Sequence, residues 1–304
     1  MIGSCYFCGH TQLVAARLQR PIVYERSVFT FYYCKKCYGY SLFPKLSDTQ
    51  IARLYSISYV ENLKPEKSSS EQVTWNKFLQ LENFLASYDS GPGSILLDYG
   101  CGADPATFPI ARRYGLEPLG MEYSEDIRGV VSTKTGVKMY SRDDFLASNL
   151  KFDIIFLGDV IEHLVNPEIE LKHLKSKLNP NGILIAQGPL QGARTLTHLI
   201  VRLYAIFSKL KTSDYPPYHV SLAHRKSMKR IINLAGFEKT KIECTEVDWP
   251  APRYREFIGA PSTRGLILLI VKSIDKFIAR IAKPYGSRYF LVAEISGRER
   301  LNKK

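Results

Sequence analysis

The amino-acid sequence predicts an α/β protein built on a mostly parallel sheet, preceded by a small cysteine-rich module. From about residue 75 onward, short apolar runs alternate with segments of helical periodicity, which is typical of a parallel sheet. Two Cys-x-x-Cys pairs lie upstream of these runs. At 304 residues the chain is long enough for a full α/β core and a smaller module beside it.

The cysteine-rich module contains two pairs separated by 25 residues rich in Val, Tyr and Phe: Cys5, Cys8, Cys34 and Cys37. Four thiolates at this spacing suit a tetrahedral Zn²⁺ ion, and the stretch between them can form a hairpin, as in a zinc ribbon. Because four cysteines fill the tetrahedron, we expect the ion to be structural. A redox role would need only one pair, and a module that has lost its metal is the plainer alternative.

A helix is expected over residues 46–59, and a polar linker follows at 64–70. We therefore predict a zinc ribbon and its following helix over residues 1–62 and a second domain over 63–304. A helix that contains Phe78, Leu81 and Leu85 leads into the first strand of this domain.

The first strand of the second domain, residues 94–97, ends at Asp98, and the chain then turns through Gly100, Cys101 and Gly102. Glycine allows backbone angles and a close approach that a side chain would block. Asp104 and Pro105 are typical of a helix start, so a helix is expected to about Tyr114.

The second strand, residues 119–122, places Glu122 at its carboxyl end, beside the glycine loop. A carboxylate there can accept hydrogen bonds from two ribose hydroxyls. A dinucleotide site would have a third glycine where Pro105 stands. Asp98 would repel a pyrophosphate but would pair with the ammonium group of a methionine moiety. The sequence therefore predicts S-adenosylmethionine as the cofactor.

The third strand, residues 137–140, leads to Asp144 and Phe145. An acid followed by an aromatic residue could bind the adenine amino group and stack on its ring, or could simply begin a helix. The fourth strand, residues 152–157, is followed by Asp159, and a helix at 168–178 then leads to a fifth strand at 183–186.

Together these motifs resemble the class I S-adenosylmethionine-dependent methyltransferases over about residues 75–297. The matching segments are Leu97-Asp98-x-Gly100-Cys101-Gly102, Glu122, Phe152-Asp153, Asp159-Val160-Ile161-Glu162-His163, Leu178 to Gly182, and His219 with Ala235-Gly236-Phe237. The resemblance implies a Rossmann-like sheet whose last strand is antiparallel. It places Asp98, Gly100 and Gly102 at the methionine end of the cofactor and Glu122 at the ribose. Asp144, Phe145 and Asp159 would then lie near the adenine or the sulfonium.

The whole chain, zinc ribbon included, is similar to a subgroup that modifies sugars, glycans and other small metabolites, and Pro44, Tyr55 and Tyr59 also match that subgroup. One residue departs from the family pattern, because the family usually has another glycine where Asp104 stands. A catalytically inactive, methyltransferase-like binding module is therefore an alternative to the enzyme.

Two histidines are the candidate catalytic residues. Methyl transfer to a hydroxyl is helped by a base within hydrogen-bond reach. His163, after the fourth strand, is the first candidate and His219 the second. Either histidine could instead only hold a loop in place.

The net charge of +13 is unevenly distributed, because residues 185–304 carry +13 and residues 71–184 carry −5. A basic last third indicates an anionic acceptor, such as a sugar phosphate, a nucleotide sugar or a lipid-linked saccharide. An rRNA or tRNA methyltransferase is the alternative. Nucleic acid is the less favoured partner, since residues 159–162 lack the Asp-Pro-Pro-Tyr type of loop found in enzymes that methylate base nitrogens.

Two further segments, near residues 190–218 and 250–287, have an amphipathic helical pattern. They are expected either to be lids over the acceptor site or to make peripheral contact with an anionic membrane. The first residues lack the basic start and apolar stretch of a signal peptide, so a cytoplasmic location is expected.

Overall fold

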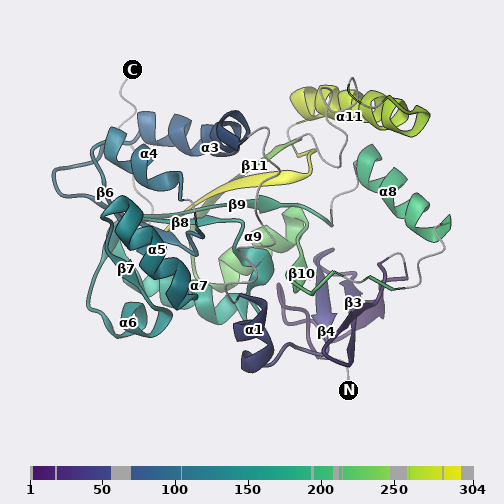
Figure 1. Cartoon of the computed structure of the whole chain (residues 1–304), viewed down its shortest axis with the longest axis horizontal. Coiled ribbons are helices and arrows are strands. Elements are labelled where there is room, and N and C mark those ends of the chain that lie inside the picture. Colours follow the sequence, from purple (N-terminus) through teal and green to yellow (C-terminus); the bar gives the residue numbers. More distant parts are fainter. Residues whose placement is uncertain are drawn as a thin grey trace.

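The computed structural model describes residues 3–17, 19–55, 70–103, 105–192, 195–207, 212–213, 215–246, 259, 261–282 and 284–295. Within these residues the chain forms two β-sheets. The larger sheet crosses the middle of the molecule, and the smaller one lies at the lower right in Figure 1.

The larger sheet has seven strands in the order β11-β12-β9-β8-β5-β6-β7. Neighbouring strands from β9 to β7 pair in parallel, whereas β12 pairs antiparallel with both β9 and β11. The predicted Rossmann-like sheet with an antiparallel last strand is therefore confirmed. Its strands are β5 (Ile95–Tyr99), β6 (Glu117–Met121), β7 (Met139–Tyr140), β8 (Phe152–Gly158), β9 (Leu178–Pro189), β11 (Lys239–Thr245) and β12 (Arg288–Glu294).

Apolar residues cover both faces of this sheet. Neighbouring side chains of a strand point to opposite sides, so consecutive apolar residues supply both faces. Leu96 packs in the cluster that contains Leu81 and Ile110, while Leu97 packs in the cluster that contains Leu171 and Ile231. The helices that cover the sheet are α3 (Ser70–Ala86), α4 (Thr107–Arg113), α5 (Glu125–Thr135), α6 (Arg142–Ala147), α7 (Pro167–Lys177) and α9 (Arg225–Leu234). Helix α4 begins at Thr107, slightly later than the sequence predicted.

The smaller sheet is antiparallel and is centred on β3 (Ser27–Cys34). Strands β1 (Leu13–Ala15), β2 (Ile22–Tyr24) and β4 (Tyr40–Phe43) pair with it. A short strand from far along the chain, β10 (Ser221–Leu222), pairs with β4 and extends the sheet. The second predicted domain therefore contributes a strand to the ribbon. The predicted boundary near residue 62 lies outside the described residues and stays a prediction.

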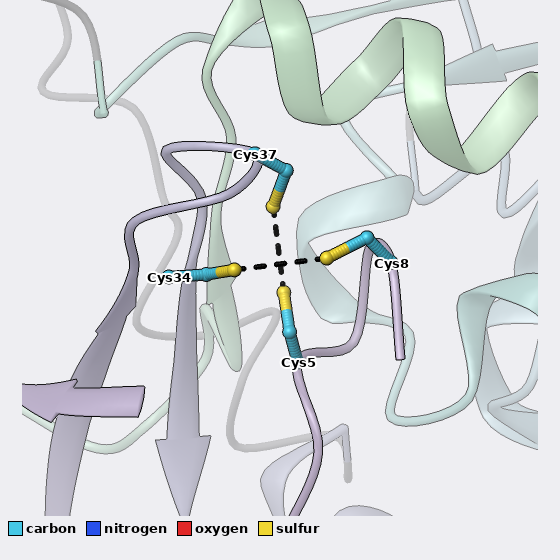
Figure 2. Close-up of side chains that lie close together, drawn as sticks. All are labelled: Cys5, Cys8, Cys34 and Cys37. Atoms are coloured by element: carbon cyan, nitrogen blue, oxygen red, sulfur yellow. Dashed lines mark hydrogen bonds between the residues drawn. The ribbon is translucent and has the colours of Figure 1, made fainter. Parts of the chain in front are cut away.

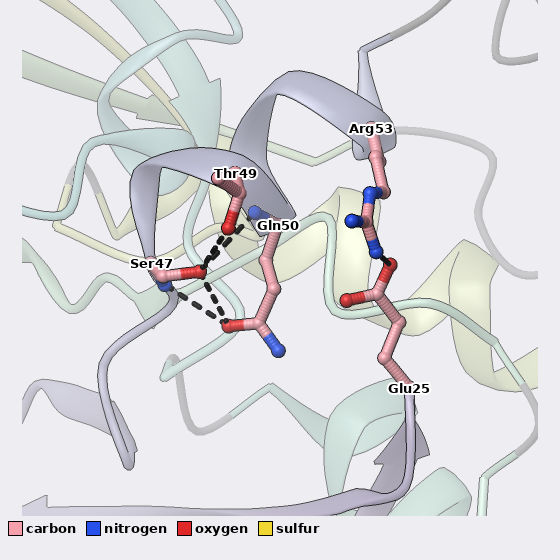
Figure 3. A network of polar contacts seen from close by, with 5 residues as sticks. All are labelled: Glu25, Ser47, Thr49, Gln50 and Arg53. Carbon is pink, nitrogen blue, oxygen red and sulfur yellow. Dashed lines mark hydrogen bonds and ion pairs between the residues drawn. The ribbon is translucent and has the colours of Figure 1, made fainter.

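Helix α1 (Asp48–Leu54) is fixed at both ends, as Figure 3 shows. At its start, Ser47 Oγ accepts a hydrogen bond from the Gln50 amide at 3.2 Å, and the Ser47 amide donates to Gln50 Oε1 at 3.0 Å. This capping box satisfies two backbone donors of the first turn. Near its end, Arg53 pairs with Glu25, in the turn between β2 and β3, at 2.8 Å. Helix α1 is shorter than predicted, and residues 56–59 lie outside the described part.

Two helices, α8 (Leu196–Phe207) and α11 (Thr263–Ile281), lie within the segments predicted as lids. The buried Asp275 carboxylate of α11 accepts hydrogen bonds from the amides of Leu196 at 3.0 Å and Thr197 at 2.7 Å. A carboxylate at these amides satisfies free donors of the first turn of α8. Among the described residues, no helix combines the length and apolar character needed to cross a membrane.

Candidate active site and metal centre

The glycine loop after β5 has a conformation that excludes larger residues. Gly100 has a φ of +76° and Gly102 a φ of +69°, both in the left-handed region. A Cβ atom on Gly100 would also lie 2.9 Å from a methyl group of Val160. The amides of Gly100 and Cys101 donate to the Met121 carbonyl at 2.8 and 3.2 Å, so the loop is held against the end of β6.

Asp98 lies buried on β5, just before this loop. Thr107 Oγ1, at the start of α4, donates a hydrogen bond to its carboxylate. Cys101 is half-buried, and burial, with the nearby charges of Asp98 and Glu122, raises the pKa of its thiol. Cys101 is therefore a neutral thiol near pH 7. Asp104, the departure from the family pattern, lies outside the described residues.

Glu122 follows β6 directly and turns its carboxylate toward the glycine loop. Its Oε2 accepts from the Gly102 amide at 3.0 Å, and its Oε1 accepts from the amides of Tyr123 at 2.7 Å and Ser124 at 3.3 Å. A carboxylate offers about four acceptor positions, so three are already used by backbone donors. Two ribose hydroxyls would therefore have to displace or share one of these bonds.

Asp144 and Phe145 lie in the first turn of α6. Ser141 caps this helix, and its Oγ donates to the Asp144 carboxylate at 2.6 Å, which is the helix-start role left open by the sequence. Phe145 is 1% exposed and packs with its ring centroid 5.6 Å from Tyr99 and 5.9 Å from Phe152. No face of this ring is open for adenine to stack on, so the structure does not support the stacking role.

Asp159 follows β8 and has a φ of +58°, which is uncommon for a residue other than glycine. Its amide donates to the Gln187 carbonyl at 2.9 Å, and its carboxylate pairs with Arg288 of β12 at 2.5 Å. Backbone conformations of this kind cluster at functional sites. The turn that Asp159 makes leads directly into the short 3₁₀ helix Ile161–His163.

The structure brings His163 and His219 together, although 56 positions separate them. Their ring centroids are 4.9 Å apart. The Val220 amide donates to the Glu162 carbonyl at 2.9 Å, which holds the two segments side by side. Burial, and secondarily the neighbouring His163, lowers the pKa of His219 to about 4, so its imidazole is neutral near pH 7.

Each histidine ring is oriented by an oxygen atom at its Nδ1. His163 Nδ1 lies 2.7 Å from the Tyr218 carbonyl oxygen and 2.9 Å from the Tyr55 hydroxyl. His219 Nδ1 lies 2.9 Å from Gln191 Oε1. A carbonyl oxygen only accepts, so both Nδ1 atoms carry a proton, and the neutral His219 presents a lone pair at Nε2.

The four cysteines of the ribbon point their sulfur atoms at a common centre, as Figure 2 shows. The Sγ atoms of Cys5 and Cys37 are 3.5 Å apart, those of Cys8 and Cys34 are 3.6 Å apart, and all four lie within 4.8 Å of one another. The hydrogen bond between Cys5 and Cys37 lowers the pKa of Cys5. This donor set fits a tetrahedral ion held by four thiolates.

The sequence did not single out several residues that surround the histidines. Gln191 and Tyr218 orient the rings, and Arg288 pairs with Asp159. Tyr55 was noted only as a match to the subgroup. The Tyr-Pro-Pro-Tyr-His run before His219 was a usable signal for Tyr218, because proline restricts the chain to few conformations. Gln191 and Arg288 carry no such local signal.

Comparison with protein-family models gives a match to the "Methyltransferase domain" family over residues 73–242, more than half of the chain. The chain therefore belongs to this family of methyltransferases, and the predicted class of enzyme is confirmed.

Two curated relatives are both named "Ubiquinone biosynthesis O-methyltransferase". The one from Bradyrhizobium diazoefficiens is 26% identical over 118 residues, covering 35% of this chain and 44% of the relative. The one from Agrobacterium fabrum is 29% identical over 101 residues, covering 31% of this chain and 40% of the relative. The chain thus spans less than half the length of these relatives.

Among solved structures, a SAM-dependent methyltransferase from Archaeoglobus fulgidus aligns with a TM-score of 0.48 and 18% identity, covering 78% of this chain and 99% of that one. Phosphoethanolamine N-methyltransferase 2 from Haemonchus contortus, in complex with S-adenosyl-L-methionine, aligns with a TM-score of 0.48 and 14% identity, covering 91% and 71%.

Proposed function

We propose that this chain transfers the methyl group of S-adenosylmethionine to a hydroxyl of a small or glycan-type acceptor. The acceptor oxygen forms a bond to the methyl carbon, the bond from that carbon to the sulfonium breaks, and the hydroxyl proton is released. S-adenosylhomocysteine remains. His163 and His219 activate this hydroxyl, and Asp98, Gly100, Cys101, Gly102 and Glu122 hold the cofactor.

The observation that carries the proposal is the position of the histidine pair. Both rings lie at the carboxyl end of β8, next to β5, whose carboxyl end carries the glycine loop. Ligands of open parallel sheets bind at this edge. Methyl transfer requires mainly that donor and acceptor are aligned and that water is excluded. The names of the curated relatives, both O-methyltransferases, favour a hydroxyl acceptor.

We further propose that Cys5, Cys8, Cys34 and Cys37 bind a structural Zn²⁺ ion. The four sulfur atoms leave no open position, so the ion would stabilise the ribbon rather than take part in transfer. The sheet around it is small, and a metal ion is a common substitute for a large core in such modules.

We also propose that helix α11 makes peripheral contact with an anionic membrane. Helix α11 exposes Ile270, Ile274, Phe277 and Ile281 at steps of four, three and four residues, which places them along one face. Its acidic residue, Asp275, is buried, while Lys276 and Arg280 are basic. An apolar face flanked by cations suits the surface of an anionic bilayer, where a lipid-linked acceptor would be found.

Vesicle flotation at low salt tests the membrane contact. With vesicles of anionic lipid the wild type is expected to float, and Phe277→Glu is expected to remain in solution. Ile169→Glu, a change at an exposed apolar residue of α7, is the matched control and should float like the wild type. A wild type that stays in solution would remove the membrane contact from the proposal.

The cofactor proposal is tested by isothermal titration with S-adenosylmethionine. Asp98→Ala and Glu122→Ala are expected to weaken binding about 10- to 100-fold, because each removes hydrogen bonds to a charged group worth about 1.5–3 kcal/mol. Glu125→Gln, at the start of α5, is the control. Radiolabelled methyl transfer to a panel of nucleotide sugars then identifies the acceptor. A wild type that releases no heat would favour the inactive binding module.

A further inference from the structure

A second cluster of metal-binding side chains lies at the carboxyl end of β8, apart from the four cysteines. One ligand atom from each of Glu162, His163 and His219 lies within 4.8 Å of the other two. Around an ion at about 2.1 Å, tetrahedral ligand atoms are about 3.4 Å apart. Side-chain rotations would have to close this difference, while the Val220–Glu162 hydrogen bond holds the backbone of the cluster in place.

The two histidines are oriented as metal ligands usually are. In metal sites a ligating histidine typically donates its other ring N–H to a carbonyl or carboxylate, which fixes the tautomer and the ring plane. Here His163 donates from Nδ1 to the Tyr218 carbonyl, and His219 donates from Nδ1 to Gln191 Oε1. In this tautomer Nε2 is the ring nitrogen that can bind an ion. The Tyr55 hydroxyl, 3.4 Å from the same Tyr218 carbonyl, adds a second contact on the His163 side.

The charges around the cluster suit a cation. Glu162 is 3% exposed and supplies one negative charge. Asp159 and Arg288 pair with each other at 2.5 Å, so their formal charges cancel. A divalent cation would balance the charge of the Glu162 carboxylate.

We propose that Glu162, His163 and His219 bind a first-row divalent transition-metal ion whose open positions take the acceptor hydroxyl. Two histidines and one carboxylate are a donor set that suits such ions, and three protein ligands leave room for a substrate oxygen. The ion lowers the pKa of the bound hydroxyl and orients it toward the sulfonium methyl group. The histidines thus act on the acceptor through the metal ion. The acceptor part of this proposal rests on the proposed methyl transfer, whereas the metal site stands on its own geometry.

The probe is Mn²⁺, added to the purified full-length protein without acceptor. Electron paramagnetic resonance reports binding, because the signal of free Mn²⁺ is lost when the ion is bound. Mn²⁺ is not expected to bind at the four cysteines, because thiolates prefer Zn²⁺ and Mn²⁺ prefers oxygen and nitrogen ligands. The wild type is expected to bind one ion per chain. His219→Gln and Glu162→Gln are each expected to weaken Mn²⁺ binding at least about tenfold.

Two controls separate a lost metal site from a lost fold. His173→Gln changes a half-buried histidine of α7 outside the cluster and should bind Mn²⁺ like the wild type. Gln191→Leu leaves all three ligands in place but removes the orienting oxygen, and about 10- to 100-fold weaker binding is expected of a residue that orients a ligand. Titration with S-adenosylmethionine should be unchanged in every variant.

A wild type that binds S-adenosylmethionine but no Mn²⁺ would overturn the metal site and leave the proposed methyltransferase intact. Equal Mn²⁺ binding by the wild type, His219→Gln and Glu162→Gln would also overturn it. A protein that binds Mn²⁺ at this cluster but does not bind S-adenosylmethionine would keep the metal site and remove the proposed activity.

Discussion

The cofactor half and the histidine half of the candidate site are built in different ways. The cofactor half comes from one continuous stretch, β5 to the start of α5, in which the Gly102 amide donates to Glu122 at 3.0 Å. The histidine half gathers Tyr55, His163, Gln191 and His219 from four separate segments. The first half depends on local backbone conformation, whereas the second depends on how the ribbon and the larger sheet meet.

Among the described residues, the ribbon makes direct contacts with the histidine half. Strand β10 pairs with β4 of the ribbon and begins two residues after His219. Tyr55, at the end of α1, lies 2.9 Å from His163 Nδ1. Damage to the ribbon should therefore affect the histidines and leave the glycine loop in place. This difference gives three tests.

The largest effect is expected from Cys34→Ser. Loss of one thiolate should abolish binding of the proposed zinc ion and unfold the ribbon, because metal binding supplies much of the folding free energy of such modules. Methyl transfer should be lost, whereas titration with S-adenosylmethionine should still show binding. Zinc analysis measures loss of the ion, thermal unfolding measures loss of the ribbon fold, and isothermal titration measures S-adenosylmethionine binding.

Cys244→Ser is the matched control for this change, since Cys244 is a buried cysteine of β11 outside the four-cysteine cluster. It should keep its zinc and its methyl transfer. Equal loss of cofactor binding in Cys34→Ser would contradict the separation of the two halves.

An intermediate effect is expected from Gly100→Ala. Left-handed backbone costs an alanine about 1–2 kcal/mol. The new methyl group would also contact Val160. Binding of S-adenosylmethionine should weaken about tenfold, which corresponds to about 1.4 kcal/mol. Mn²⁺ binding at the histidine cluster should change little.

Gly129→Ala tests whether this result comes from backbone conformation. Gly129 lies inside α5, where an added Cβ meets open space. Alanine is favoured over glycine inside a helix by about 0.5–1 kcal/mol, so thermal stability should rise slightly and cofactor affinity should stay the same. A similar loss of affinity in both variants would show that the effect does not come from the left-handed backbone conformation at Gly100.

The smallest effect is expected from Tyr55→Phe. Removing one hydroxyl that orients His163 should lower kcat/KM about fivefold, since a neutral hydrogen bond contributes about 1 kcal/mol. Cofactor affinity should not change. Tyr215→Phe, at a residue that is 79% exposed, is the control and should have wild-type kinetics. A fall in cofactor affinity in Tyr55→Phe alone would show that the two halves are coupled.

Much of the fold could be predicted from the sequence, because its signals are local. Apolar runs marked the buried strands, and Gly100 and Gly102 marked a loop whose φ angles are indeed positive. The cysteine spacing marked a cluster whose sulfur atoms converge. Phe145 shows the limit of such signals, since an aromatic residue after an acid suits both an adenine contact and a core position. Packing against Tyr99 and Phe152 decided for the core.

The sequence by itself therefore determined the positions of the parallel strands along the chain, the glycine loop and the four ribbon cysteines. All of these depend on neighbours within a few residues, where propensity and spacing carry the information. Only the tertiary structure decided that β10 would join the ribbon sheet and that Gln191, Tyr218 and Tyr55 would orient two distant histidines. Such contacts depend on the packing of segments far apart in the chain, and no local pattern specifies them.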